Sequence, residues 1–389
     1  MRILADQHIH YLDQLIPSYA EIVHYDSSEG IPRLEGFDAW ILRTVTKVNP
    51  KTVPSLPEEL KFIGSASAGT DHIDREYLSD NGIQFDHSPG CNANAVAEYV
   101  LTSMLTWCSS TRRELSNHKV GIIGMGHTGG ALAKKLDAIG VSYASYDPPK
   151  ALREESFRSC HLDTLKDCDI LSFHLPYIDQ GRYPTHHFIP DILSLTPKHK
   201  LIINAARGGI IKEDYLLRHN ELISLPNKKI SFVLDVWETE PVPDKVLVNQ
   251  AFIATPHIAG YSKQAKIQAS KGVLRGLLSF FDTEWTDSKW QHEQMDSTKT
   301  KLGEASHRGF NKKTNTLSLS VLHGLHNYDN EMRKLINLPG QGADSGPFNT
   351  SIARGFQALR NTIELRNEFA HTTFPKGLPD DLRPVFAPD

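Results

Sequence analysis

The feature that most constrains the fold is a glycine-rich turn between a short apolar strand and a helix. The strand is expected at residues 120–123 (VGII), the turn at 124–129 (GMGHTG) and the helix from residue 131 onward. Asp147 follows at the end of the next expected strand. A G-x-G-x-x-G match alone is weak, but here strand, glycines, helix and acid agree in order and spacing. Together they predict a βαβ unit that binds a dinucleotide.

Each glycine of this turn has a mechanical reason. Gly124 allows the tight turn, Gly126 lets the backbone approach a pyrophosphate, and Gly129 lets the helix pack closely on the strand. The free amide groups at the start of the helix then bind the phosphates. The alternative is a βα turn that binds nothing, and the agreement of the surrounding elements argues against it.

Asp147 predicts which dinucleotide is bound. A carboxylate at this position holds the adenosine ribose diol and repels a 2′-phosphate, so NAD is expected as the cofactor. The nearby cations Lys150 and Arg153 weaken the argument against NADP.

Short apolar runs alternate with helical patterns in two series along the chain. This rhythm predicts an α/β protein with parallel sheets, and the six strands of the second series fit a doubly wound nucleotide domain. Strands are expected in the first series at residues 2–5, 39–42, 62–64 and 83–85, and in the second at 120–123, 142–145, 170–173, 201–203, 231–234 and 252–254.

The 389 residues predict two to three domains. Residues 94–108 have helical spacing and are expected to join the two series, and the apolar stretch 273–281 returns the chain to the first domain. We therefore expect a first domain of residues 1–94 and 256–284 and a nucleotide domain of residues 95–255. Residues 285–389 form a third unit, with a polar linker up to about residue 317 and a poorly ordered tail from Pro375.

Composition restricts the partners and the compartment. A formal net charge of −4 gives no global reason to bind nucleic acid or an anionic membrane, so small molecules are the expected partners. The four cysteines contain no C-x-x-C pair and are expected as reduced thiols. The amino-terminal sequence lacks a secretory signal and no apolar run approaches membrane-spanning length, which favours the cytoplasm.

Three further segments follow expected strands of the second series. They are residues 204–209 (NAARGG), 235–241 (DVWETEP) and 255–260 (TPHIAG). Because ligands bind at the carboxyl ends of strands in open α/β sheets, these segments are expected to converge. Here the chain resembles the D-isomer-specific 2-hydroxyacid dehydrogenase family, whose pattern has an arginine, a glutamate and a histidine in these contexts.

The resemblance implies a catalytic set of Arg207, Glu240 and His257. An imidazole can take the hydroxyl proton near neutral pH while hydride leaves the same carbon, so His257 is expected as the base. Glu240 orients and stabilises the imidazole, and Arg207 binds the substrate carboxylate and polarises the developing carbonyl. The family's acid stands directly before proline, which selects Glu240 over Glu238. Each residue alone also has an ordinary structural explanation, and the three together favour catalysis.

The same resemblance implies further residues around the cofactor. It also implies a Rossmann-like NAD domain, a flavodoxin-like substrate domain and a small carboxyl-terminal α+β dimerisation domain. The implied cofactor-binding residues are Gly124, Gly126, His127, Thr128, Gly129, Asp147, Leu175, Ala205, Ala206, Asp235 and Gly260.

Phrases in the first domain narrow the resemblance to one branch of the family. Residues 43–49 (RTVTKVN), 68–74 (AGTDHID) and 89–93 (PGCNA) are similar to a branch that acts on a phosphorylated four-carbon hydroxy acid. That resemblance implies substrate contacts from Thr44, Ser67 and Tyr261. A substrate phosphate needs positive charge, for which Arg43 and Lys47 are candidates, although each also fits an ordinary solvated loop.

Several alternatives stay open at this point. Another D-2-hydroxyacid dehydrogenase, such as one that acts on phosphoglycerate, or an NAD-sensing binding protein would carry the same motifs. A homodimer is expected only by analogy, because residues 285–389 resemble the family in pieces. No metal is expected, since the adjacent His186 and His187 lack an H-E-x-x-H or Cys/His context and are interpreted as solvated.

Overall fold

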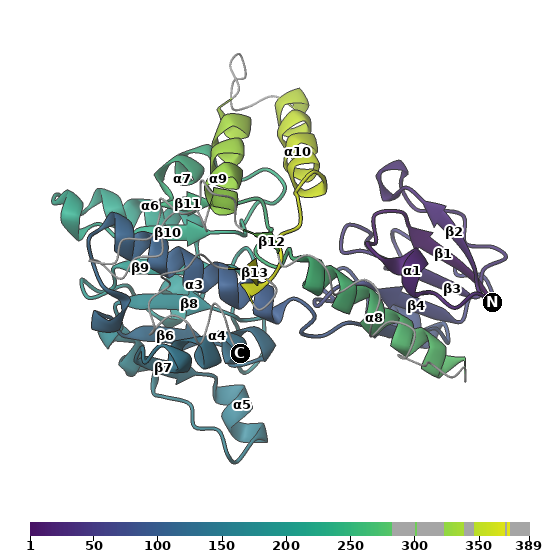
Figure 1. Ribbon diagram of the computed structural model, residues 1–389, viewed down its shortest axis with the longest axis horizontal. Coiled ribbons are helices and arrows are strands. Elements are labelled where there is room, and N and C mark those ends of the chain that lie inside the picture. Colours follow the sequence, from purple (N-terminus) through teal and green to yellow (C-terminus); the bar gives the residue numbers. More distant parts are fainter. Residues whose placement is uncertain (282–299, 302–322, 338–345, 370–371, 374–389) are drawn as a thin grey trace. The chain divides into compact units, whose positions relative to one another are not determined.

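The computed structural model describes residues 1–281, 300–301, 323–337, 346–369 and 372–373 (Figure 1). The chain divides into two compact units. The first contains Met1–Ala93 and continues from Tyr261, and the second contains Asn94–Gly260 together with the described residues from Thr300 onward. The expected linker at 285–317 and the tail from Pro375 lie almost wholly outside the described residues, apart from Thr300–Lys301.

The first unit is built on a parallel sheet of five strands in the order β2-β1-β3-β4-β5. Both faces of this sheet are covered by apolar side chains, as expected for parallel strands. Its strands are β1 (Arg2–Asp6), β2 (Glu21–Tyr25), β3 (Ala39–Leu42), β4 (Phe62–Ser65) and β5 (Gln84–His87), and its α-helices are α1 (Leu12–Leu15), α2 (Arg75–Asp80) and α8 (Lys263–Phe280).

Helix α8 returns to the first unit and packs on β4 and β5. The approach is close because glycines face their neighbours. A Cβ added at Gly64 would lie 2.3 Å from Val273 Cγ2, and one at Gly276 would lie 1.9 Å from Asp86 Oδ2. The helix begins earlier than the apolar run at 273–281 predicted, because the Ser262 side chain caps it by accepting a hydrogen bond from the Ala265 amide.

The second unit is built on a parallel sheet of six strands in the order β11-β10-β9-β8-β6-β7. The order reverses beside β6, which has β8 on one side and β7 on the other. Ligands of such sheets bind at this reversal, outside the carboxyl ends of the strands. The strands are β6 (Val120–Ile123), β7 (Tyr143–Tyr146), β8 (Ile170–Phe173), β9 (Leu201–Asn204), β10 (Ser231–Leu234) and β11 (Ile253–Ala254).

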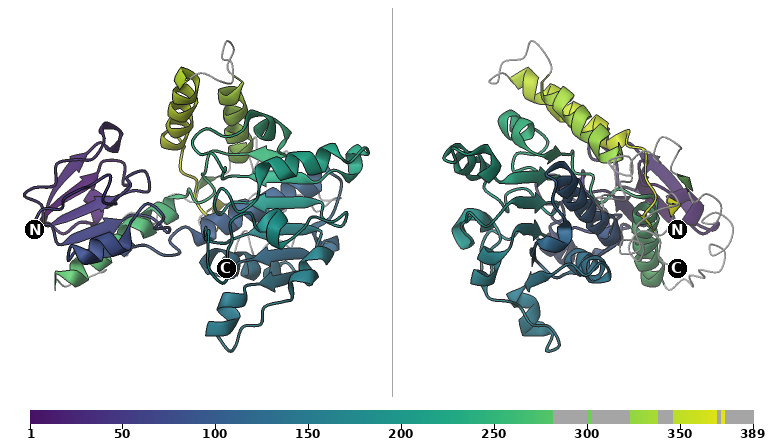
Figure 2. Two further views of the ribbon diagram at one scale, coloured as in Figure 1. Left: turned by 180° about the vertical axis from the view of Figure 1, so that it is seen from behind. Right: turned by 60° about the vertical axis from the view of Figure 1, so that its left-hand side comes forward.

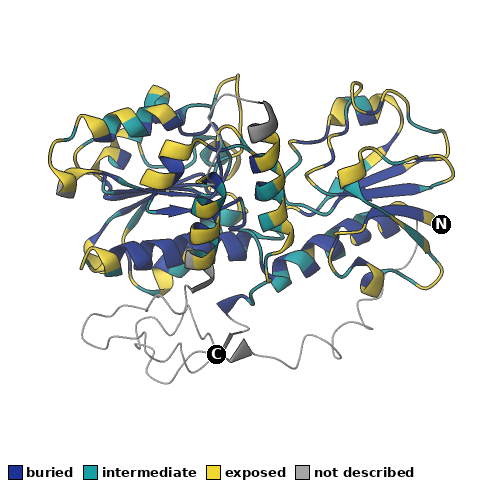
Figure 3. Ribbon diagram, turned by 90° about the horizontal axis from the view of Figure 1, so that it is seen from above, coloured by how far each residue is buried: buried dark blue, intermediate teal, exposed yellow. Residues whose placement is uncertain are grey.

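Helices cover both faces of the second sheet, and Figure 3 shows its buried strands between helices with exposed outer faces. The helix α3 packs with α4 in one apolar cluster, while α9 packs on β11 and α7. These helices are α3 (Ala93–Ser110), α4 (His127–Ala138), α5 (Pro148–Arg153), α6 (Glu213–Glu221), α7 (Lys245–Gln250), α9 (His323–Ile336) and α10 (Gly346–Asn361).

The carboxyl-terminal helices α9 and α10 lie side by side (Figures 1 and 2) and belong to the second unit. Met332 and Phe356 are buried in the same cluster as side chains of β8, β9 and β10. Asp329 of α9 accepts a hydrogen bond of 2.8 Å from the Ala254 amide, which fixes α9 to β11. The short strands β12 (Thr300–Lys301) and β13 (Thr372–Thr373) pair in parallel. A separate domain for residues 285–389 remains a proposal.

The fold class predicted from the sequence is confirmed by the two parallel sheets. Strand β2 was not predicted, because Glu21–Tyr25 lies at the edge of the sheet and its side chains are exposed or half-buried. Among the described residues, no helix is both long and apolar enough to span a bilayer.

Candidate active site

The core of the candidate site is a hydrogen-bonded pair of His257 and Glu240 in the second unit. The two side chains follow β11 and β10, which are neighbouring strands of the sheet. His257 Nδ1 lies 2.9 Å from Glu240 Oε2, and Glu240 Oε1 accepts a bond of 2.9 Å from the Trp237 amide. The carboxylate therefore fixes the orientation of the imidazole and leaves Nε2 for a substrate.

The charge state of Glu240 is set by this pair. Burial alone would raise the pKa of Glu240, but the charge and the hydrogen bond of His257 lower it, and the Trp237 amide adds to this effect. The net result is a pKa below the usual glutamate value, so Glu240 is a carboxylate at neutral pH.

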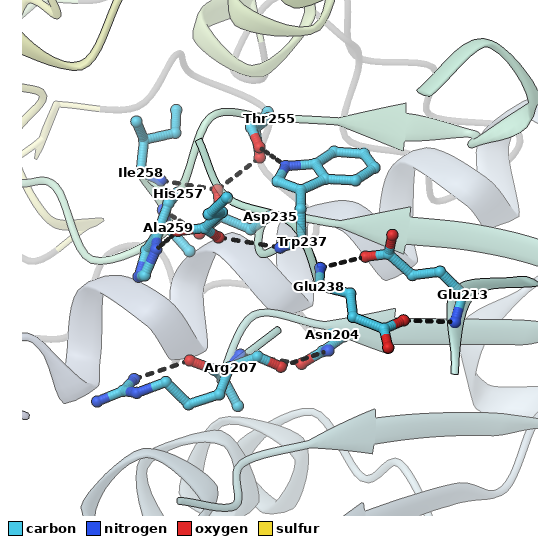
Figure 4. A network of polar contacts seen from close by, with 12 residues as sticks. Asn204, Arg207, Glu213, Asp235, Trp237, Glu238, Thr255, His257, Ile258 and Ala259 are labelled. Carbon is cyan, nitrogen blue, oxygen red and sulfur yellow. Dashed lines mark hydrogen bonds and ion pairs between the residues drawn. The ribbon is translucent and has the colours of Figure 1, made fainter. Parts of the chain in front are cut away.

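Asp235 holds the loop that carries His257. Asp235 is 1% exposed, and its Oδ1 accepts hydrogen bonds from the Thr255 hydroxyl at 2.6 Å and the Ile258 amide at 2.7 Å. Its Oδ2 accepts from the Ala259 amide at 2.8 Å. Burial raises the pKa of Asp235 despite these donors. The network in Figure 4 thus supports His257 in a left-handed backbone conformation with φ of 58°.

Arg207 follows β9, the third neighbouring strand. Asn204 shapes its loop, because the Asn204 side chain donates to the Arg207 carbonyl at 2.9 Å and accepts from the Ala206 amide at 3.2 Å. Arg207 Nη1 donates to the Ala206 carbonyl at 2.8 Å. The loop lies against the loop of Glu240, since a Cβ on Gly208 would lie 1.9 Å from the Trp237 carbonyl oxygen. Strands β9, β10 and β11 thus present Arg207, Glu240 and His257 in adjacent loops.

The glycine turn has the geometry of a dinucleotide site. Gly124 has φ of 92°, and a Cβ on Gly129 would lie 1.9 Å from the Gly124 carbonyl oxygen. Gly126 occupies the N-cap position of α4, where no side-chain hydrogen bond caps the helix. A Cβ added to Gly126 would meet nothing within 4 Å. His127 and Thr128 form the first turn of α4. The space beside Gly126 at the start of α4 is therefore open, as a group that approaches the helix amino terminus requires.

Asp147 lies beside this turn. Its Oδ2 accepts a hydrogen bond of 2.8 Å from the Met125 amide, and its Oδ1 accepts one of 2.9 Å from the Lys150 amide. Lys150 Nζ donates to the Met125 carbonyl at 2.8 Å and pairs with Glu154 at 3.5 Å. Lys150 thus has partners within the protein, so its charge counts less against the expectation that the cofactor is NAD.

The remaining residues expected at the cofactor also belong to the second unit. The Leu175 side chain follows β8 and lies next to Gly124, and Ala205 and Ala206 follow β9. Gly260 ends the segment that carries His257.

The residues expected at the substrate belong to the first unit. Arg43 and Lys47 follow β3. Arg43 is not an ordinary solvated residue, because its Nε lies 2.9 Å from Oδ2 of the buried Asp6 and its Nη2 donates to Ser27 at 3.2 Å. Lys47 and Thr44 are exposed.

Ser67 and Tyr261 also lie in the first unit. The Ser67 hydroxyl donates to the Gly69 carbonyl at 2.8 Å and lies 2.7 Å from Ser65 Oγ. Tyr261 precedes α8, and Lys266 Nζ lies 3.6 Å from the centre of its ring. The Ser67 hydroxyl thus lies just after β4, and the Tyr261 hydroxyl and the Lys266 ammonium lie near the start of α8.

The sequence interpretation missed a polar group next to Glu240. Glu238, over which the family pattern selects Glu240, is an exposed residue, and its Oε1 lies 3.0 Å from His187 Nε2 while its Oε2 accepts from the Glu213 amide at 3.2 Å. The Glu238 amide donates to Glu213 Oε1 at 2.6 Å. Burial, together with the charge of Glu238, raises the pKa of Glu213 to about 8. No local motif links residues 51 positions apart, so the sequence held no signal for the His187 contact.

Comparisons with known proteins agree with this geometry. Residues 97–259 match the family described as D-isomer specific 2-hydroxyacid dehydrogenase, NAD binding domain. The chain is 35% identical over 349 residues to erythronate-4-phosphate dehydrogenase of Proteus mirabilis, covering 88% of this chain and 89% of that protein. It is 38% identical over 286 residues to the enzyme of the same name from Photorhabdus laumondii, covering 72% of this chain and 74% of that protein.

Solved structures share the fold. The NAD+-bound 3-phosphoglycerate dehydrogenase of Entamoeba histolytica superposes with a TM-score of 0.58 at 23% identity, covering 72% of this chain and 95% of that chain. A D-2-hydroxyisocaproate dehydrogenase superposes with a TM-score of 0.56 at 21% identity, covering 72% of this chain and 97% of that chain.

Proposed function

The chain belongs to the family of erythronate-4-phosphate dehydrogenases, which are NAD-dependent D-2-hydroxyacid dehydrogenases, and we propose that it oxidises 4-phospho-D-erythronate. The product is (R)-3-hydroxy-2-oxo-4-phosphooxybutanoate, on the route to pyridoxal 5′-phosphate. The observation that carries the proposal is the His257–Glu240 pair, in the same unit as the dinucleotide turn. An imidazole held by a carboxylate is the group that an alcohol oxidation needs.

The residues of the glycine turn fit NAD. The backbone of Gly126 and the start of α4 bind the pyrophosphate, and Asp147 binds the adenosine ribose. NAD held by these residues would supply the hydride acceptor for the oxidation. Leu175, Ala205, Ala206, Asp235 and Gly260 complete the proposed cofactor site. The buried carboxyl group of Asp235 holds the His257 loop by accepting hydrogen bonds from the Ile258 and Ala259 amides.

His257 removes the proton of the 2-hydroxyl group as hydride leaves the same carbon. Nδ1 of its ring is held by Glu240, so Nε2 takes the proton. The positive charge that forms on the ring is stabilised by the Glu240 carboxylate. In the reverse direction the same nitrogen returns the proton to the 2-oxo group.

Arg207 binds the substrate carboxylate, and its fixed charge polarises the carbonyl that forms at the neighbouring carbon. Thr44, Ser67 and Tyr261 form hydrogen bonds with the substrate, Ser67 as an acceptor because its own proton goes to the Gly69 carbonyl. Arg43 and Lys47 supply positive charge for the phosphate. The Arg43–Asp6 ion pair supports a role in which Arg43 acts from a fixed position rather than as a mobile surface charge.

The proposal extends to assembly and location. The carboxyl-terminal residues resemble the small dimerisation domain of the family, and we propose a cytoplasmic homodimer. Light scattering coupled to size exclusion at micromolar chain concentration measures the assembly. A mass equal to twice the 43.5 kDa chain is expected, and the mass of one chain contradicts the dimer.

Substrate-dependent formation of NADH tests the proposed reaction. We expect kcat/KM for 4-phospho-D-erythronate to exceed that for D-3-phosphoglycerate and D-lactate by about 100-fold or more, because unpaired polar groups penalise the wrong acid. Equal or greater activity with D-3-phosphoglycerate would assign the chain to another substrate. Absence of turnover with all three acids, with NAD binding intact, would contradict the dehydrogenase assignment.

A further inference from the structure

Two histidines and a glutamate form a second polar cluster in the second unit. His186 and His187 follow β8 in the chain, and Glu238 follows β10. One possible ligand atom from each of the three lies within 4.8 Å of the others. The imidazole rings stack with their centres 3.7 Å apart, and His187 Nε2 lies 3.0 Å from Glu238 Oε1. This cluster lies outside the proposed set of Arg207, Glu240 and His257.

The backbone holds the two histidines in place. The Ile178 carbonyl accepts hydrogen bonds from the Thr185 amide at 2.8 Å and the His186 amide at 3.1 Å, which closes a loop of residues 178–186. The His187 amide donates to the Gly209 carbonyl at 2.8 Å. His187 adopts φ of 50°, an uncommon value for a side chain of its size, so its position is set by its surroundings.

Neighbouring carboxyl groups fix which ring nitrogens are available. Asp179 Oδ1 lies 3.3 Å from His186 Nδ1, which leaves Nε2 of that ring as the ligand atom. Histidines that bind a metal commonly donate their other nitrogen to a carboxylate in this way. Glu238 is oriented in turn by the Glu213 amide, which binds Oε2 and leaves Oε1 toward His187.

The spacing suits a zinc ion. Nitrogen and oxygen ligands at about 2.1 Å from zinc, separated by bond angles of 90–109°, lie roughly 2.9–3.4 Å from each other. The observed 3.0 Å between His187 and Glu238 falls in this range. The His186 and Glu238 side chains are each 33% exposed and can close on an ion by rotation. We propose that His186, His187 and Glu238 bind one zinc ion, with water as the fourth ligand.

A bound ion would join two loops of the second unit directly, and a third through the hydrogen bond of His187. His187 is bonded to the loop of Gly209, two residues after Arg207, and Glu238 lies two residues before Glu240. Zinc therefore stabilises the arrangement that presents the proposed catalytic groups, without contacting the reacting atoms. Binding should raise the thermal unfolding temperature, because an ion that binds the folded chain more tightly than the unfolded chain stabilises it.

Calorimetric titration of zinc chloride into the chelator-treated full-length chain, prepared without a polyhistidine tag, tests the site. We expect one ion per chain with micromolar or tighter affinity and a higher unfolding temperature. His187→Ala, His186→Ala and Glu238→Gln should each weaken binding by about 10-fold or more. Matched controls are His161→Ala, which removes an exposed histidine, and Cys160→Ser, which removes a half-buried thiol.

Two outcomes would overturn the proposal. One is the absence of zinc binding by the wild-type chain. The other is binding that survives both His186→Ala and His187→Ala but is lost in Cys160→Ser. Circular dichroism and NAD binding show whether each variant is folded, and His186→Ala, at the more exposed position, is the second test if His187→Ala does not fold. Cobalt in place of zinc should give the visible spectrum of nitrogen and oxygen ligands, without a thiolate charge-transfer band.

Discussion

The two parallel sheets present different chemistry at the carboxyl ends of their strands. In the second unit the loops after these ends carry the acids Asp235 and Glu240, and α6 begins with a third buried acid, Glu213. The oxygens of these acids bind backbone amides or His257. In the first unit they hold exposed Thr44 and Lys47, the hydroxyl of Ser67 and one buried acid, Asp6, whose Oδ2 lies 2.9 Å from Arg43 Nε. On the proposed function, the loops of the second unit carry the chemistry and the loops of the first unit recognise the substrate, although the two sheets share one architecture.

Removal of the His257 imidazole is expected to have the largest effect, because it tests the proposed chemistry of the second unit. His257→Ala should lower kcat by about 100- to 10,000-fold, the usual contribution of a general acid–base group. NAD affinity, measured by fluorescence titration, should stay within about 2-fold of wild type, well under the 1.4 kcal/mol of a tenfold change. The matched control is His161→Ala at an exposed site of the same unit. Unchanged turnover of the His257 variant would remove the proposed mechanism.

Glu213 tests whether the acids of the second unit carry a cost in stability. Burial, with the charge of Glu238, raises the pKa of Glu213 from 4.5 to about 8 in the folded chain. A raised carboxyl pKa means that folding favours the protonated form. Stability is therefore lost as the pH rises from 4.5 to about 8, and no further loss occurs above that range.

Glu213→Gln keeps the acceptor for the Glu238 amide and removes the charge. We expect a free energy of unfolding on the order of 2 kcal/mol above wild type near pH 9, and nearly equal values near pH 5. Urea unfolding at both pH values measures this difference. Glu221→Gln, an exposed site of the same helix α6, should show no such dependence. A variant less stable than wild type at the higher pH would show that the charged form is favoured.

Thr44 tests the recognition side, where smaller effects are expected. Thr44→Ala removes one hydroxyl and should raise KM for 4-phospho-D-erythronate by about 3- to 10-fold, corresponding to one hydrogen bond. The kcat value should change little, because Thr44 takes no part in proton transfer. Val45→Ala at the neighbouring exposed position is the control. A loss confined to kcat would place Thr44 with the chemical groups and erase the contrast between the two units.

Buried elements of the fold can be predicted from the sequence, and exposed ones are missed. Buried strands such as Val120–Ile123 and Ile170–Phe173 were predicted at the observed bounds, because parallel strands covered on both faces are continuous apolar runs. The edge strand Glu21–Tyr25 lacks such a run and was missed. The start of α8 at Lys263 was missed because its first turns are polar.

In the candidate site, the motif-bearing residues could be predicted and the contacts between motifs could not. Glu240 and His257 were paired by the family pattern, and the structure brings them to 2.9 Å. The contact between His187 and Glu238 joins loops that only the sheet order brings together. The ion pair between Asp6 and Arg43 depends in the same way on the pairing of β1 with β3.

The return of α8 to the first unit has a consequence for synthesis on the ribosome. One face of the amino-terminal sheet is covered by Val273, Leu274 and Leu277, which are translated after the whole second sheet. Until these residues leave the exit tunnel, Ile3, Ile41 and Phe62 have no lasting cover on that face. The first segment made is therefore among the last to be completed, and the nascent chain must protect an apolar surface while its second half is assembled.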